Sequence, residues 1–486
     1  MSTHQRETAS CRAESALSLV GATTSVRPVF DSIVADQVRR IRDESSVPNI
    51  AWAVIDGDDV HAGAIGPTAS RGTAFRIASM TKSFTAALVL ALRDAGRLAL
   101  DVPVANYAPE LAGVAGPPGS AAITLRHLLS MSAGMATDDP WADRHLDASP
   151  AFVDEVYGAG VEFAHLVGEA FEYSNLGFGM IGRVVERVTG HRVRELVDEM
   201  LLGPLGMGHT TWEAPAGTAQ SAARPHVRVG EKVLPDDEAP LGYGEISPMG
   251  GLWSTVDDLA IWMRWLDRAN SVPDDDAGPL SAASRREMQT MHTYAGSLAI
   301  DGKAAPSGYG FGLLMRDDAT CGMIAGHSGG LPGFGSNMRW MKGTGVGVVA
   351  LGDVTYAPMS TFTMRVLWES MEAGLMTRRT HAVDRLLAER AEQFADLVNN
   401  WSAEAARRLF ADNVAADEPL DLRRARLSEI STACGQVSVL RVRPTARTHG
   451  EITLVGPSGS VDATIHLSPV AGGRVQSYSF GGIAPH

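Results

Sequence analysis

Ser79 and Lys82 have the three-residue spacing that puts two side chains on one face of a helix. Lys82 is one of only four lysines in the chain and precedes an apolar run expected to be buried. Burial lowers the pKa of a lysine, so an uncharged Lys82 amine is expected to take the proton of the Ser79 hydroxyl. The start of the helix predicted over residues 78–92 favours negative charge developing on Ser79. The alternative is that Ser79 caps the helix while Lys82 extends to water.

Two further elements contain residue types that complement this pair. Tyr173 and Asn175 form the only Y-x-N in the chain. A phenol beside a lysine can shuttle protons, and a carboxamide can orient the lysine and the substrate. Their alternative roles are a buried phenol and a helix cap.

The third element begins with His327, placed at the start of a predicted strand, and continues through Gly329 and Gly330. Glycine there lets a substrate lie along the strand edge, and the Gly330 N–H is expected to join that of Ser79 in an oxyanion hole. The alternative is a glycine-rich turn with a histidine on the surface.

In this order, the three elements resemble those of the serine β-lactamase and penicillin-binding-protein superfamily, in the branch of class C β-lactamases, family VIII esterases and D-aminopeptidases. The resemblance covers roughly residues 30 to 375 and includes further segments similar to that family, at residues 96–111, 123–135, 204–210, 248–262 and 309–315. It implies an acyl-enzyme on Ser79, with Lys82 and Tyr173 sharing proton transfer.

The third element departs from the family pattern, because β-lactamases have Lys-Thr/Ser-Gly where this chain has His327-Ser328-Gly329. A mostly neutral histidine supplies less positive field for a β-lactam carboxylate. Relatives with histidine here are typically esterases, D-amino-acid amidases, carboxypeptidases or transacylases. We therefore expect a serine acyl hydrolase acting on a small-molecule or short-peptide ester or amide. The alternative is an acyltransferase, a transacylase or peptide cyclase in which an amine or alcohol intercepts the acyl-enzyme.

Two other interpretations fit parts of the sequence. Residues 326–330 fit G-x-S-x-G, the nucleophile elbow of α/β-hydrolases, with Ser328 as nucleophile and Asp353 and His381 as partners. The residues after Ser328 make a poor helix start, which disfavours this reading. The second interpretation is a catalytically inactive binding module, against which the presence of Ser79, Lys82 and Tyr173 argues.

The elements that must position these residues indicate an α/β (α+β) fold. We expect a β-lactamase/transpeptidase-like antiparallel sheet flanked by helices, with an all-helical subdomain inserted between its strands. The predicted elements are a helix at 31–43, a hairpin at 50–66, mostly helices over 88–188, a helix at 255–266 opened by a capping box at 254–257, and strands at 309–315, 335–341 and 345–351. Helices at 383–411 and 419–434, then four strands over 436–481, predict a small α+β domain.

The predicted domains are an N-terminal leader (1–29), a catalytic domain (30–378) and an accessory domain (379–486) that serves as a dimerisation or lid-like module. A formal net charge of -14 argues against nucleic-acid and anionic-membrane partners. No cofactor and no metal are expected, because the three cysteines are widely spaced and His127 and His145 lack ligand partners at a usable spacing. The N-terminal residues lack the apolar run of an export signal, which predicts a cytoplasmic address.

Overall fold

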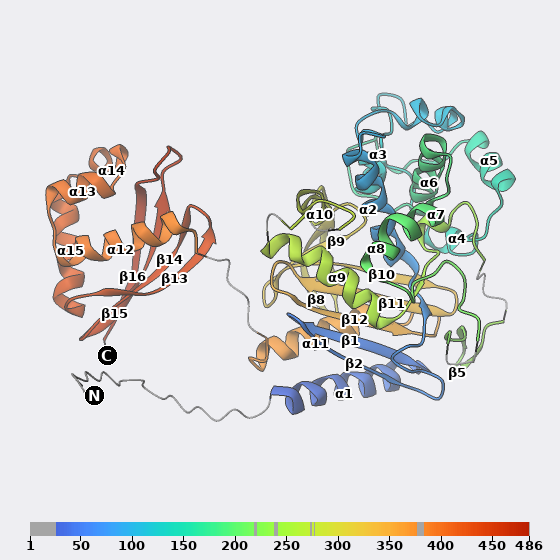
Figure 1. The fold of residues 1–486 in the computed structure, drawn as a ribbon, viewed down its shortest axis with the longest axis horizontal. Helices are drawn as coiled ribbons and strands as arrows, with labels where there is room; N and C mark the ends of the chain where they lie inside the picture. Colours follow the sequence, from blue (N-terminus) through green and yellow to red (C-terminus); the bar gives the residue numbers. More distant parts are fainter. Residues whose placement is uncertain are drawn as a thin grey trace, which may run out of the picture.

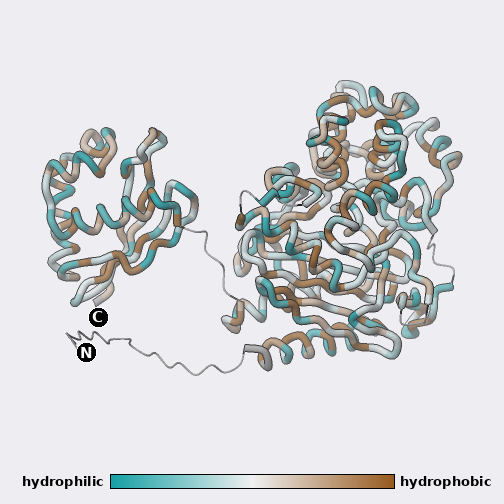
Figure 2. Tube along the Cα trace, viewed as in Figure 1, coloured by the Kyte–Doolittle hydropathy of each residue, from teal (hydrophilic) through white to brown (hydrophobic). Residues whose placement is uncertain are grey.

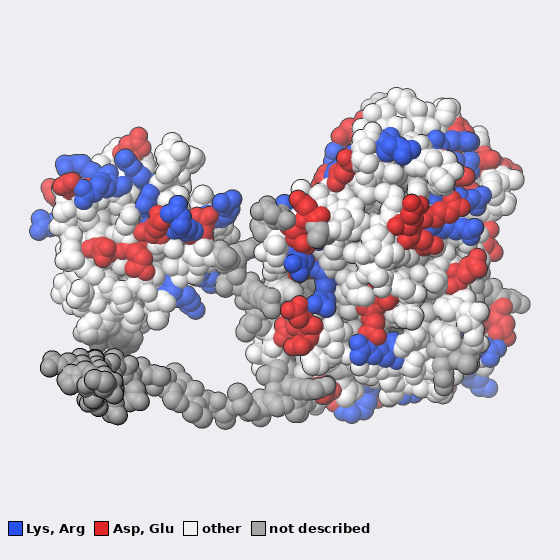
Figure 3. All heavy atoms as spheres, in the orientation of Figure 1, with Lys and Arg blue, Asp and Glu red and all other residues white. Residues whose placement is uncertain are grey.

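The computed structural model describes residues 26–217, 221–237, 242–272, 275–276, 278–376 and 383–485 (Figure 1). Most of the predicted leader and His381 lie outside these residues. Among the described residues, no helix combines the length and the apolar character needed to cross a bilayer. Acidic and basic side chains are interspersed over the visible face (Figure 3).

An eight-stranded antiparallel sheet forms the centre of residues 26–376, in the order β2-β1-β12-β11-β10-β9-β8-β7. Its strands are β1 (Ile50–Asp56), β2 (Asp59–Ile65), β7 (Thr293–Ile300), β8 (Lys303–Tyr309), β9 (Leu314–Asp318), β10 (Gly322–Leu331), β11 (Phe334–Met341) and β12 (Val346–Gly352). The predicted hairpin is confirmed, with Asp56 opposite Asp59 across a turn in which Gly57 has φ +64°. The pairing of β1 with β12 joins segments from both ends of this region, as predicted.

Helices cover both faces of this sheet (Figure 1). On one face, α1 (Val26–Ser45) and α11 (Met359–Glu372) share an apolar core with alternate residues of the strands. On the other face, α2 (Thr81–Asp94) and α9 (Val256–Ser271) lie over the remaining alternate residues. A helix on each face buries both sets of strand side chains, so the strands read as nearly continuous apolar runs.

A helical subdomain lies between β2 and β7 in the chain, as predicted. Its helices are α3 (Leu125–Leu129), α4 (Asp139–Ala142), α5 (Pro150–Ala159), α6 (Asn175–Thr189), α7 (Val193–Val197) and α8 (Gly203–Leu205), followed after β4 (His226–Val229), β5 (Lys232–Pro235) and α9 by α10 (Ala282–Met288). The short strands β3 (Phe75–Arg76) and β6 (Trp253–Ser254) pair beside the start of α2. That pairing connects the subdomain to the sheet next to Ser79.

Four details differ from the sequence predictions. The predicted strand at 309–315 is divided: Tyr309 ends β8, residues 314–315 begin β9, and residues 310–313 form the turn between them, where Gly312 adopts φ +67°. The N-cap of α9 is Thr255, which accepts from the Asp258 N–H, while Asp257 pairs with Arg71, so there is no capping box at 254–257. His327 lies within β10 rather than at the start of a strand. The fourth difference is that Ser79 lies in a 3-10 turn before the start of α2.

Residues 383–485 form a separate hydrophobic core. It contains α12 (Arg385–Asn399), α13 (Ala403–Leu409), α14 (Asp412–Asp417) and α15 (Leu420–Cys434), and an antiparallel sheet of β13 (Ser438–Ala446), β14 (His449–Gly456), β15 (Gly459–Leu467) and β16 (Val475–Pro485). The predicted helices-then-strands order is confirmed, except that Ser402 caps a new helix and divides the first helical stretch. Apolar positions follow the strands of both sheets in Figure 2.

Candidate active site

Ser79 lies in a tight turn rather than in the regular helix predicted from residue 78. Residues Ala78–Met80 form a 3-10 turn, and α2 begins at Thr81. Ala78 has φ +49°, a conformation that is costly for a residue with a Cβ and that clusters at functional sites. Ser79 is 8% exposed. The turn presents its hydroxyl at the N-terminal end of α2, where the helix dipole favours negative charge.

Lys82 is fully buried and its ammonium nitrogen has three close oxygen partners. Nζ donates to the Ser79 Oγ at 2.9 Å, the Asn175 Oδ1 at 2.6 Å and the Met249 carbonyl at 2.9 Å. Burial lowers the pKa of Lys82 from 10.5 to about 8, although the nearby carboxylates of Asp139, Asp143 and Asp138 act in the opposite direction. The uncharged amine is therefore a minor form near neutral pH that grows toward pH 8, and it makes Lys82 a usable base for Ser79.

Asn175 is held by two carboxylates at the start of α6. Asp138 accepts from the Asn175 and Leu176 N–H groups, each at 2.7 Å, and so caps the helix. Asp139 accepts from the Asn175 Nδ2 at 2.7 Å, which leaves the Oδ1 for Lys82. The Asn175 carboxamide therefore fixes the position of the Lys82 amine relative to α6.

Tyr173 precedes α6 and lies against both residues of the Ser79–Lys82 pair. Its ring centroid is 5.0 Å from the Lys82 Nζ, and the nearby Ser79 side chain partly offsets the rise of its pKa. Burial, with Tyr309 and Asp139 nearby, raises the pKa of Tyr173 well above its usual value. The phenol therefore keeps its proton near neutral pH, so it suits a proton relay better than a phenolate base.

His327 points from β10 toward the same place and is uncharged. It is 3% exposed, and burial together with the charge of Lys82 lowers its pKa to about 3. Its Nδ1 lies 2.5 Å from the Ser328 carbonyl, which can only accept, so Nδ1 carries the proton. The Nε2, 2.8 Å from the Tyr309 hydroxyl, is then an acceptor. His327 thus places no positive charge in the site.

Gly329 and Gly330 allow β10 to approach the Ser79 turn closely. A Cβ on Gly329 would stand 2.3 Å from the Ile77 carbonyl, and one on Gly330 would stand 2.4 Å from the Tyr356 ring. Only glycine fits at such separations. This contact brings the backbone of β10 beside that of Ser79, as an oxyanion hole requires.

The Ser328 alternative lacks the geometry of a nucleophile elbow. Ser328 lies within β10, which turns directly into the antiparallel strand β11 with no helix after it. Its hydroxyl accepts from the Asn337 Nδ2 at 2.8 Å. The Asp353 carboxylate accepts from the Asn49 Nδ2 at 2.6 Å and lies 3.2 Å from the His226 Nδ1. His381 lies outside the described residues.

Comparison with known proteins shows the family. The family model described as Beta-lactamase matches residues 34–367, which is more than half of the chain. The chain belongs to the beta-lactamase family. The match includes all seven candidate residues, at positions 79, 82, 173, 175, 327, 329 and 330.

This beta-lactamase family member is similar to Penicillin-binding protein 4 of Amycolatopsis lactamdurans, at 31% identity over 320 residues, covering 63% of this chain and 81% of that protein. Its fold is like that of the octameric penicillin-binding protein homologue from Pyrococcus abyssi, with a TM-score of 0.60 at 18% identity, covering 93% of this chain and 99% of that one. It is also like that of a D-stereospecific amidohydrolase from Streptomyces sp., with a TM-score of 0.56 at 23% identity, covering 71% and 98%.

Four groups that contact the candidate residues were not predicted from the sequence. These are Asp138, Asp139, the Met249 carbonyl and Tyr309. Tyr309 and Met249 belong to segments noted as similar to the family, but nothing in their spacing links them to His327 or Lys82. The two aspartates precede Pro140, a pattern that marks a helix start without indicating which side chains it serves. His127, predicted to cap a helix or lie in solvent, forms a capping pair with Thr124.

Proposed function

We propose that the protein is a serine acyl hydrolase that cleaves an ester or amide through an acyl-enzyme on Ser79. The observation that carries the proposal is the fully buried Lys82, 2.9 Å from the Ser79 hydroxyl and with its pKa lowered to about 8. Membership of a family of serine hydrolases supports the same reaction class.

In the proposed reaction, uncharged Lys82 takes the Ser79 proton as Oγ attacks the substrate carbonyl carbon. The N–H groups of Ser79 and Gly330 bind the oxyanion. Tyr173 gives its proton to the leaving alcohol or amine as the carbonyl–leaving-group bond breaks, and is reprotonated by the Lys82 ammonium. Water then attacks the ester by the reverse sequence of proton transfers, which releases the acid and regenerates Ser79.

The substrate proposal follows from the uncharged His327. Without a cation at that position, an anionic group next to the reacting carbonyl gains little electrostatic stabilisation. We therefore propose uncharged esters and amides as better substrates than β-lactams. Transfer to an amine or alcohol remains the alternative, because water and an acceptor compete for the same Ser79 ester. The cytoplasmic address stays a prediction.

The test is covalent labelling with a fluorophosphonate, followed by intact-mass analysis of the wild type and of the Ser79→Ala and Ser328→Ala variants. The expected result is one adduct on the wild type and on Ser328→Ala, and none on Ser79→Ala. An adduct that persists in Ser79→Ala, or its absence from the wild type, would contradict the proposal.

A substrate panel then separates hydrolysis from transfer. It contains p-nitrophenyl esters, D-amino-acid amides and nitrocefin, each with and without an amine acceptor. Hydrolysis predicts free acid as the main product even when the amine is present. Predominant formation of the amide product would replace the hydrolase proposal with the acyltransferase.

A further inference from the structure

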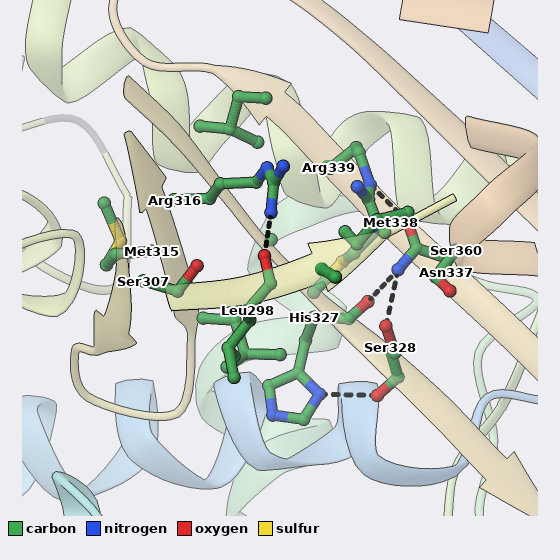
Figure 4. A pocket seen from close by; sticks show the side chains of 15 residues that line it. Leu298, Ser307, Met315, Arg316, His327, Ser328, Asn337, Met338, Arg339 and Ser360 are labelled. Carbon is green, nitrogen blue, oxygen red and sulfur yellow. Dashed lines mark hydrogen bonds between the residues drawn. The ribbon is translucent and has the colours of Figure 1, made fainter. Parts of the chain in front are cut away.

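A second cavity lies behind β10, on the face of the sheet opposite Ser79. Its volume is about 320 Å³, and its lining comes from β7, β8, β9, β10, β11 and α11. Paired positions of neighbouring strands share a face, so Gly326, Arg339 and Leu314 point to this side while His327 and Met338 point to the other. In Figure 4 the His327 ring points away from the guanidinium groups of Arg316 and Arg339. His327 and Ser328 also line the cavity, so β10 is the strand that separates it from the acyl site.

Arg339 places an uncompensated positive charge in this cavity. The side chain is 6% exposed, and its Nε donates to the Asn337 Oδ1 at 2.8 Å. Among the described residues, no carboxylate forms an ion pair with Arg339 and its two terminal nitrogens have no hydrogen-bond partner. Burial and the neighbouring Arg316 lower its pKa to about 9. The terminal nitrogens, which no protein group occupies among the described residues, are available to an anion in the cavity.

The second arginine is held in place by protein groups. Arg316 donates to Asp318 at 3.2 Å, to the Leu298 carbonyl at 2.8 Å and to the Lys303 carbonyl at 2.8 Å. Asp318 offsets one of the two guanidinium charges, which leaves a net charge of about one positive unit facing the cavity. That balance suits a monoanion.

The remaining lining is amphipathic. It combines the aliphatic side chains of Leu298, Ile300, Leu314 and Ile324 with the hydroxyl groups of Ser307, Ser328 and Ser360. Gly326, directly opposite Arg339, is packed closely, because an added Cβ would stand 2.8 Å from the Arg339 Cα and Cβ. The cavity thus has one charged end and apolar walls, as sites for small amphipathic ligands do.

We propose that this cavity binds the carboxylate of a small organic acid with an apolar body, with the carboxylate on the terminal nitrogens of Arg339. The planar guanidinium matches a carboxylate in a bidentate arrangement. A phosphate dianion fits less well, because only one guanidinium has free donors and Asp318 lies nearby. The proposal does not depend on the reaction at Ser79.

The bound acid would also affect the strand that carries His327. Asn337 accepts from Arg339 and donates to the Ser328 hydroxyl at 2.8 Å and to the His327 carbonyl at 3.3 Å. An anion that fixes Arg339 therefore fixes this chain of hydrogen bonds. Arg339 and the strand that carries His327 thus belong to one chain of hydrogen bonds.

The test is calorimetric titration of the full chain with octanoate, after Ser79 has been blocked by a fluorophosphonate so that binding in the acyl site does not contribute. Octanamide serves as the uncharged probe and inorganic phosphate as the anion without an apolar body. The variants are Arg339→Met and Arg339→Lys. The control is Arg264→Met, which removes an exposed arginine paired with Asp58.

Octanoate is expected to bind the blocked wild type and Arg264→Met equally, and octanamide to bind neither. Loss of a charge-assisted pair should weaken octanoate binding to Arg339→Met by about tenfold or more. Arg339→Met should melt no lower than the wild type, because the unpaired charge is removed. Unchanged octanoate affinity in Arg339→Met, equal binding of octanamide, or preference for phosphate would overturn the proposal. If Arg339→Met does not fold, unchanged affinity in Arg339→Lys overturns it, and weakened affinity supports it.

Discussion

The Ser336 hydroxyl on β11 donates a 2.7 Å hydrogen bond to the carbonyl of Ile77, two residues before Ser79. Both residues are buried, and Ala78 between Ile77 and Ser79 has a positive φ. The turn that carries the candidate nucleophile is therefore held by β11 as well as by β10.

Ser336→Ala should leave the Ile77 carbonyl buried without this donor. The Ile77 carbonyl still accepts from the Met80 N–H at 3.2 Å, so we expect the free energy of unfolding to fall by about 0.5–1.5 kcal/mol, with a fall in kcat as the Ser79 turn loosens. Chemical denaturation and ester turnover measure the two effects. The control is Ser370→Ala, because the Ser370 hydroxyl is buried without a partner and its loss should not destabilise the protein. Equal behaviour of the two variants would contradict the role given to Ser336.

Gly329→Ala should separate β10 from the Ser79 turn. The added Cβ would meet the Ile77 carbonyl and the Ser336 Oγ, each at 2.3 Å, so the strand must move. A displacement approaching 1 Å in the oxyanion hole is expected to lower kcat/KM by about a hundredfold. The comparison is Gly208→Ala, where an added Cβ meets nothing within 4 Å. Retention of full activity by Gly329→Ala would argue against a close contact at this strand.

The acylation rate should rise with pH to a midpoint near 8. The pKa of Lys82 is lowered to about 8, so the uncharged base is the minor form below that pH and the major form above it. Because the pKa of Tyr173 is raised well above its usual value, deprotonation of the phenol should not reduce activity just above the midpoint. A pH profile of kcat/KM on a p-nitrophenyl ester measures this. Lys82→Arg, which stays protonated, should remove activity throughout the range.

Asp143→Asn should move that midpoint to lower pH. Asp143 accepts from the Tyr356 phenol at 2.7 Å, and burial raises its pKa to about 7, so it is mostly ionised where Lys82 titrates. Its negative charge favours the Lys82 ammonium, and the amide removes that effect. The same pH profile tests the shift, with the exposed Asp58→Asn as control. An unmoved midpoint would mean that Asp143 does not act on Lys82.

The sequence indicated candidate residues, whose roles stay predictions, but it indicated few of the contacts among them. The spacing of Ser79 and Lys82 is local, so it could be read directly, as could the alternating strands and the hairpin at Gly57. Tyr309 and Asp139 were missed because their partners are 18 and 36 residues away, and only the fold brings them together. The strand predicted over 309–315 was wrong because its apolar residues continue through a glycine turn that reverses the chain. Lys82 was recognised as buried, but its contact with Met249 was not.

The separate core of residues 383–485 has a thermodynamic consequence. Because its apolar contacts and those of residues 26–376 belong to different clusters, melting of one unit removes few contacts from the other. The chain should therefore unfold in two heat-absorption peaks, and an inhibitor attached to Ser79 should raise the temperature of only one of them.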